Sequence, residues 1–264
     1  MQVISDAVKQ YLIASNLREE SAHTAKRYYM SDMGKCRRMR YLKRKGITVE
    51  LRDYVYWLFK MGNLLHEYGY TALEAQSLLL QGEEVFGNEH FSGRYDGIIN
   101  AANEGDPVKK VLFDFKSAGA YQMKKAIAGG ENVENIAQVL GSVLLVRETK
   151  PELAESGILV YLNKEPGDKM PYISFDREYH LTKIRERSLH EEMDTMIDHF
   201  ISNKIPRCTC PSWNKPFNAY QPFCTMSEEK IGHYLKLVED GYKVITAYTK
   251  VFTEKDGKRK EESL

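Results

Sequence analysis

One apolar segment of the chain contains an acid and a lysine: Val111-Leu112-Phe113-Asp114-Phe115-Lys116-Ser117. Its apolar residues predict a buried strand over 110–117. Because strand side chains alternate between the two faces of a sheet, Asp114 and Lys116 project together while Phe113 and Phe115 occupy the other face. We therefore expect an acid and a lysine side by side on one face of the strand, while the aromatic residues of the other face pack in the core.

A second acid precedes this strand. Residues 83–88 and 90–100 predict a hairpin with its turn near Asn88, and Gly93-Arg94-Tyr95-Asp96-Gly97 places Asp96 on a neighbouring strand. Two carboxylates on adjacent strands can hold a hard divalent cation through oxygen, and a lysine beside them can orient an attacking water. Phosphodiester hydrolysis needs this chemistry.

The surrounding pattern alternates between helices and strands. Apolar spacing predicts helices over 4–17, 53–76, 133–144 and 179–202, and strands over 157–163 and 172–175 that pair with each other. A C-terminal helix with some strand character over 227–251 and a solvated tail over 254–264 complete the chain. This order predicts an α/β core with helical additions at both ends.

Composition adds limits rather than an assignment. The chain has 264 residues with 38 Lys+Arg against 37 Asp+Glu, so disordered and collagen-like classes are excluded and the net charge favours no partner. It contains no run of about 18 apolar residues and no signal-peptide core. We therefore expect a cytoplasmic protein without a membrane partner.

Four cysteines are too few for a disulfide framework in a chain of this length. Cys36 comes early, whereas Cys208, Cys210 and Cys224 lie close together near the end. Four thiolates suit either an iron–sulfur cluster or a structural zinc ion, and unligated thiols are the third alternative.

A basic run surrounds the first cysteine. Seven basic residues and no acid stand between Lys35 and Gly46, among them Arg37, Arg38 and Arg40, with Tyr41 inside the run. In one interpretation the arginines contact phosphates and Tyr41 stacks on a base. In the other, the run is a solvated helix face.

In their order, these motifs resemble those of the PD-(D/E)XK nuclease superfamily, and in particular its RecB-type exonucleases, including the CRISPR-associated branch that carries an iron–sulfur cluster. Met61-Gly62-Asn63-Leu64-Leu65-His66 is similar to the family's Gly-x-x-x-His helix, and Asp114-Phe115-Lys116 to its acid-x-Lys motif. Asp96 matches the family's aspartate motif and Gln138 its glutamine. Ser142 stands where the family often has a tyrosine.

The resemblance implies a restriction-endonuclease-like core, a central mixed sheet flanked by helices, over 53–203. The segments 1–52 and 204–264 are then additions joined by a 4Fe-4S cluster on the four cysteines, with zinc as the alternative. His66, Asp96, Asp114 and the Phe115 carbonyl are the implied ligands of Mg²⁺ or Mn²⁺, and Lys116 the catalytic lysine. Gly62 is expected to let its helix approach the sheet closely.

The resulting hypothesis is a metal-dependent DNA exonuclease acting on single-stranded ends. Gln138, Arg37, Arg38, Arg40 and Tyr41 are its predicted DNA contacts, although Gln138 is equally compatible with a helix-surface position. A structure- or sequence-specific endonuclease is the alternative within the enzyme class. A non-catalytic DNA-binding metal-cluster module is the alternative from another class.

Overall fold

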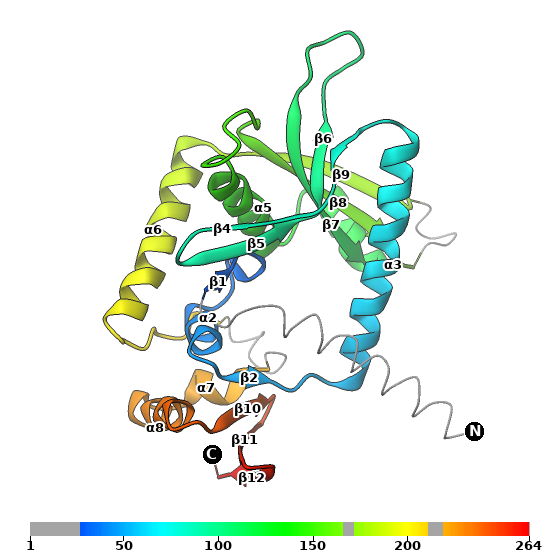
Figure 1. Ribbon diagram of the computed structural model, residues 1–264. Coiled ribbons are helices and arrows are strands. Elements are labelled where there is room, and N and C mark those ends of the chain that lie inside the picture. Colours follow the sequence, from blue (N-terminus) through cyan, green and yellow to red (C-terminus); the bar gives the residue numbers. More distant parts are fainter. Residues whose placement is uncertain (1–26, 166–171, 211–218, 264) are drawn as a thin grey trace, which may run out of the picture. The chain divides into compact units, whose positions relative to one another are not determined.

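The computed structural model describes residues 27–165, 172–210 and 219–263, and the chain divides into two compact units (Figure 1). The sheet unit comprises Tyr29–Gly34 and Leu58–Glu192. The cysteine unit comprises Met1–Tyr28, Lys35–Trp57 and Met193–Leu264. The predicted helix over 4–17 lies outside the described residues. No helix within the described ranges is long and apolar enough to cross a bilayer.

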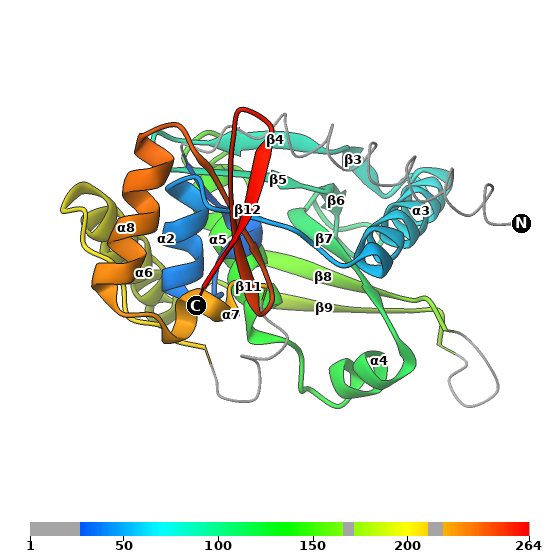
Figure 2. The ribbon, with the colours of Figure 1, turned by 90° about the horizontal axis from the view of Figure 1, so that it is seen from below.

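A five-stranded mixed sheet forms the centre of the sheet unit (Figure 2). In sheet order its strands are β3 (Leu79–Gln81), β6 (Gly97–Asn100), β7 (Lys110–Ala118), β8 (Ser156–Asn163) and β9 (Ser174–His180). Strand β7 runs parallel to β8 and antiparallel to β6, and β9 is antiparallel to β8. These strands confirm the predictions over 110–117 and 157–163. The strand predicted over 172–175 as the partner of 157–163 is confirmed as β9.

One face of β7 packs against α3 (Asp53–Ala75), the helix predicted over 53–76. Phe113 and Phe115 are buried there beside Tyr70. A Cβ at Gly69 would lie 2.5 Å from the Phe115 ring, whereas a Cβ at Gly62 would meet only Ser117 Oγ at 3.6 Å, an ordinary contact. Gly69, and not the expected Gly62, is therefore the glycine that permits the close approach.

The unit's other helices are α4 (Ala120–Ile127), α5 (Val133–Val146) and the first part of α6 (Lys183–Ile201), which continues into the cysteine unit. Helix α5 packs on β8, where a Cβ at Gly157 would lie 2.7 Å from a Val139 methyl group. The Asn132 side chain caps α5 by accepting a hydrogen bond from Glu134 N. The helix predicted over 133–144 is thus confirmed.

The predicted hairpin consists of β4 (Glu84–Gly87) and β5 (Phe91–Tyr95). Its turn is at the expected place, because Asn88 Oδ1 accepts hydrogen bonds from the backbone amides of His90 and Phe91. A second sheet has the order β1-β5-β4, with β1 at Tyr28–Tyr29 and a 3-10 turn, η1, at Met30–Asp32. The predicted second strand, 90–100, is broken at Asp96, so that β5 and β6 belong to different sheets.

Besides the end of α6, the described part of the cysteine unit contains short helices and a small sheet in the order β12-β11-β10-β2. These elements are α2 (Arg37–Arg44), β2 (Thr48–Val49), α7 (Gln221–Thr225), α8 (Glu228–Glu239), β10 (Lys243–Ala247), β11 (Lys250–Lys255) and β12 (Lys258–Glu262). The helix with some strand character expected over 227–251 is present in part, because α8 ends at Glu239 and strands follow it. The expected solvated tail is exposed over 255–261, but it forms a strand, β12, which was not predicted. Val244 and Val251 are buried in this sheet, and the polar β12 pairs along β11.

The predicted α/β class is confirmed, with sheets flanked by helices.

Candidate functional site

Asp96 occupies the break between β5 and β6. Its Oδ2 accepts a hydrogen bond of 2.6 Å from the Phe115 amide, and the Tyr70 hydroxyl donates to the Asp96 carbonyl. Both bonds reach across to elements of the core, namely β7 and α3. The strand break therefore lets Asp96 turn its carboxylate toward the middle of β7.

Asp114, Lys116 and Gln138 form a closed set of contacts. Gln138 Nε2 donates to Asp114 Oδ1 at 3.0 Å, and Lys116 Nζ donates to Gln138 Oε1 at 2.9 Å. Lys116 Nζ also lies 2.5 Å from Asp114 Oδ2 in an ion pair. As predicted from strand alternation, the acid and the lysine share the face of β7 opposite to Phe113 and Phe115. Gln138 reaches them from α5.

His66 approaches from the other side, on α3. Its Nδ1 lies 3.8 Å from Asp96 Oδ2, and its ring packs on Phe115 with the centroids 5.4 Å apart. Burial lowers the pKa of His66, so the imidazole is neutral at pH 7. A neutral imidazole is the form that binds a metal ion.

The side chains of Asp96 and Asp114 are both buried, where an ionised carboxylate is costly unless it is paired. Burial, and next to it the Asp114 carboxylate, raises the pKa of Asp96 to about 7. Asp114 Oδ2 accepts no hydrogen bond of normal geometry, despite its ion pair with Lys116. Buried carboxylates with oxygen lone pairs left over, beside one imidazole, are donors that fit Mg²⁺ or Mn²⁺.

The predicted cation ligands His66, Asp96 and Asp114 lie near one another in pairs, but their ligand atoms do not all lie within 4.8 Å of one another. Within the described ranges, the cysteine group alone brings three or more potential ligand atoms all within 4.8 Å of one another. His66 contacts Asp96, and Asp96 is tied to the backbone between Asp114 and Lys116 through the Phe115 amide. The Phe115 carbonyl as a ligand stays a prediction.

Sequence reasoning missed two residues that shape this site, Gly69 and Tyr70. Tyr70 stands four positions after His66, and residues with this spacing share one face of a helix. Gly69 lies directly before it and admits the Phe115 ring. The helical spacing from His66 is therefore a signal that could have identified Tyr70, whereas nothing in the sequence distinguished Gly69 from Gly62.

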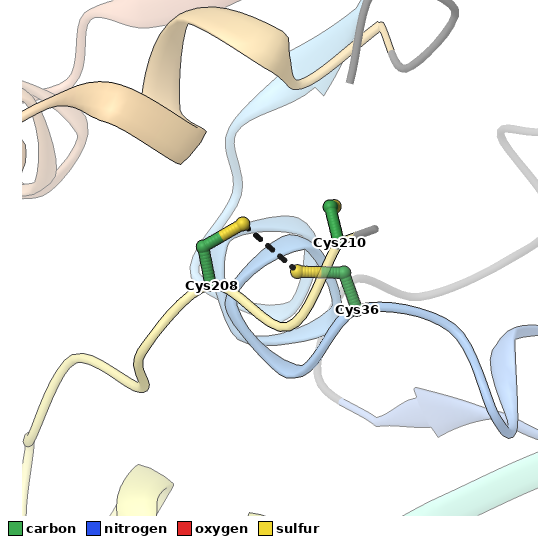
Figure 3. Close-up of side chains that lie close together, drawn as sticks. All are labelled: Cys36, Cys208 and Cys210. Atoms are coloured by element: carbon green, nitrogen blue, oxygen red, sulfur yellow. Dashed lines mark hydrogen bonds between the residues drawn. The ribbon is translucent and has the colours of Figure 1, made fainter. Parts of the chain in front are cut away.

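The four cysteines converge within the cysteine unit. Cys36 Sγ lies 3.8 Å from Cys208 Sγ, and Cys210 Sγ lies 3.7 Å from Cys224 Sγ (Figure 3 draws the first three residues). None of the four forms a disulfide, since a disulfide requires about 2.05 Å between sulfurs. Cys36 precedes α2, and Cys224 belongs to α7. The expected convergence of one early and three late thiols is thus present.

The thiols are close enough to shift one another's pKa. A hydrogen bond from the Cys224 thiol lowers the pKa of Cys36, and the same bond raises the pKa of Cys224. Around one tetrahedral ion with metal–sulfur bonds of about 2.3 Å, sulfurs lie about 3.8 Å apart. The separations of 3.8 and 3.7 Å match that edge, and the sulfurs of Cys36, Cys208 and Cys210 all lie within 4.8 Å of one another, whereas Cys224 is not part of that mutually close group.

The basic run lies mainly on α2, and its side chains are less accessible than a DNA-binding stripe requires. Of the four predicted contacts within this run, Arg38, Arg40 and Tyr41 are buried and Arg37 is partly exposed. Arg38 donates to three carbonyl groups, those of Pro206 at 2.8 Å, Phe223 at 3.0 Å and Met226 at 3.4 Å. Direct DNA contact by Arg38, Arg40 and Tyr41 is inconsistent with this burial.

Arg38 instead fastens the segments that carry the late cysteines. We expect Arg38→Ala to lower the free energy of unfolding by about 3 kcal/mol, because buried carbonyls lose a charged donor. Urea unfolding of the full chain measures this difference. Arg37→Ala, one position earlier and half-exposed, is the matched control and loses much less. Equal losses in the two variants would contradict the assignment.

Comparisons with known proteins give structural likeness only. No family model and no curated protein matches the chain. The crystal structure of SSO0001 is 18% identical with a TM-score of 0.44 over 72% of this chain and 86% of that one. An alkaline exonuclease from Laribacter hongkongensis is 11% identical with a TM-score of 0.49 over 67% and 89%. A phage related exonuclease from Haemophilus somnus is 15% identical with a TM-score of 0.37 over 55% and 72%. The functional assignment therefore rests on the residues of the site.

Proposed function

We propose that the chain is a metal-dependent DNA exonuclease that hydrolyses phosphodiester bonds at single-stranded ends. One observation carries this proposal. The Asp96 carboxylate accepts a hydrogen bond from the Phe115 amide, which lies between the acid and the lysine of Asp114-Phe115-Lys116. The Gln138 side chain is hydrogen-bonded to both Asp114 and Lys116. Two buried acids, a histidine and a lysine thus share one part of the sheet, as metal-assisted hydrolysis requires.

Each residue has a separate task. His66, Asp96, Asp114 and the Phe115 carbonyl would hold Mg²⁺ or Mn²⁺, and the bound ion supplies Lewis acidity and lowers the pKa of water. The Lys116 ammonium orients the attacking water and stabilises the negative charge that develops on the phosphate. Gln138 fixes Lys116 relative to Asp114, since its amide bonds both. Gln138 is therefore a positioning residue in this proposal.

For the cysteines we propose a structural metal centre that joins Cys36 to the late segment. The sequence resemblance implies a 4Fe-4S cluster, whereas separations of 3.7 and 3.8 Å between sulfurs suit a single tetrahedral ion such as zinc. In a four-iron cluster each thiolate binds a different iron, so the sulfurs lie farther apart than around one ion. Iron, sulfide and zinc analysis of anaerobically purified protein distinguishes the two.

The cleavage test uses 5′- and 3′-labelled linear single and double strands together with circular single-stranded DNA. With Mg²⁺ or Mn²⁺ we expect the linear single strand to be digested from an end and the circle to stay intact, and EDTA to stop digestion. A cut circle identifies an endonuclease instead. If the linear DNA stays intact with both ions, the enzyme proposal is wrong and the non-catalytic DNA-binding module takes its place.

A further inference from the structure

Helix α4 presents one exposed stripe, which consists of Tyr121, Lys124, Lys125 and Ala128. The first three residues lie on the helix and Ala128 is its C-cap, with spacings that place all four on one face. Tyr121 is 79% exposed, more than the other exposed aromatic residues in the described part of the chain. Met123 and Ala126 are buried on the opposite face, where the helix packs on β7 and β8. The stripe is therefore held on a fixed support.

The charge of the stripe is positive. Helix α4 contains no acid, and neither Lys124 nor Lys125 forms an ion pair with any residue that the structure describes. The acid nearest to the start of the helix is Glu165, which accepts a hydrogen bond from the Ala120 amide at 3.3 Å. Glu165 thus caps the N-terminus of α4, and it forms no ion pair with the ammonium groups of Lys124 and Lys125.

The stripe lies close to the candidate active site along the chain. Strand β7 ends at Ala118 and α4 begins at Ala120, as Figure 2 shows. Tyr121 follows Lys116 by five residues, so their Cα atoms are at most about 18 Å apart even if the segment were fully extended. A short nucleic acid strand can bridge this distance. In the basic run around α2, by contrast, Arg38, Arg40, Arg44 and the aromatic Tyr41 are buried.

We infer that the α4 stripe binds the single-stranded DNA whose end is cleaved, with a base stacked on Tyr121 and phosphates on Lys124 and Lys125. An exposed aromatic ring next to unpaired cations is the combination that binds single strands without regard to sequence. This inference rests on the proposed function and names the surface that holds its substrate. Ala128, which is small, leaves the end of the stripe open to the strand.

Binding is measured by fluorescence anisotropy with a labelled oligothymidylate, in the full chain carrying Lys116→Ala so that no cleavage interferes. We expect Tyr121→Ala to weaken binding about 10-fold and Tyr121→Trp to retain it, because stacking needs an aromatic ring. The double variant Lys124→Gln, Lys125→Gln should lower the slope of log Kd against log salt concentration by about 1.4, as two lost phosphate contacts require. Tyr54→Ala, on α3 and also well exposed, is the matched control and should bind like its parent.

The same substitutions with Lys116 intact separate the two proposals. If the otherwise unchanged protein digests DNA, we expect the stripe variants to raise KM while kcat stays constant. Unchanged Kd, salt slope and KM in those variants would overturn the inference and leave the nuclease proposal intact. If the protein digests no DNA but binds it through Tyr121, the nuclease proposal fails while the stripe stands as a DNA-binding surface. Equal losses in Tyr54→Ala and Tyr121→Ala would also overturn the inference.

Discussion

Replacing Lys116 with Ala lowers the rate of DNA hydrolysis by about 10³-fold, the size expected when a positioned charged group is removed from the reacting phosphate. The ammonium lies 2.5 Å from Asp114 Oδ2 and donates to Gln138 Oε1, so it is fixed before substrate arrives. Its loss removes a preorganised positive charge from beside Asp114. Single-turnover cleavage of end-labelled single strands measures the rate.

Lys110→Ala provides the matched control for this experiment. Lys110 begins the same strand, but its ammonium pairs with Glu152 at 3.4 Å and both side chains are largely exposed. We expect the wild-type cleavage rate from this variant. Thermal unfolding of both variants shows whether the fold is retained, and Lys116→Met preserves most of the buried stem if Ala does not. A folded Lys116 variant with the wild-type rate would remove Lys116 from the mechanism.

The acid-lysine pair was predictable because strand alternation is a local property. Asp114 and Lys116 stand two positions apart, and any strand through 110–117 places them on one face. Gln138 was left open from sequence, since a helix-surface residue and a site residue have the same spacing. Only tertiary packing brings its amide to Asp114 and Lys116.

The basic run shows the opposite case. Sequence charge predicts exposure, yet Arg38 is buried because three carbonyl groups from the segment after Pro206 accept its hydrogen bonds. The partners are 168 to 188 positions away, so no local pattern announces them. The C-terminal sheet was missed for a related reason, since the polar β12 becomes a strand only by pairing with β11. The burial of Arg38 and the pairing of β12 both depend on contacts outside the local sequence pattern.

Replacing Cys208 with Ser should abolish metal binding at the cysteine cluster and lower the free energy of unfolding by about 5 kcal/mol. Cys36 and Cys208 are 172 positions apart, so a metal that binds both closes a very long loop. Closing such a loop restricts the unfolded chain and thereby stabilises the folded one. Because globular proteins are stable by only about 5–15 kcal/mol, this loss is large. Metal analysis and urea unfolding of the full chain measure the two effects.

Chelation provides the control, because the variant and the stripped protein lack the same ion. A chelator should destabilise the wild-type protein by as much as Cys208→Ser does, and should leave the variant unchanged. Cys36→Ser, Cys210→Ser and Cys224→Ser should behave alike, since a four-thiolate site loses its ion with any one ligand. If a serine variant retained the metal, its cysteine would not be a ligand. If the wild-type protein carried no metal and resisted the chelator, the segments would be held by Arg38 and by hydrogen bonds between the thiols, and the large loss of stability would have no source.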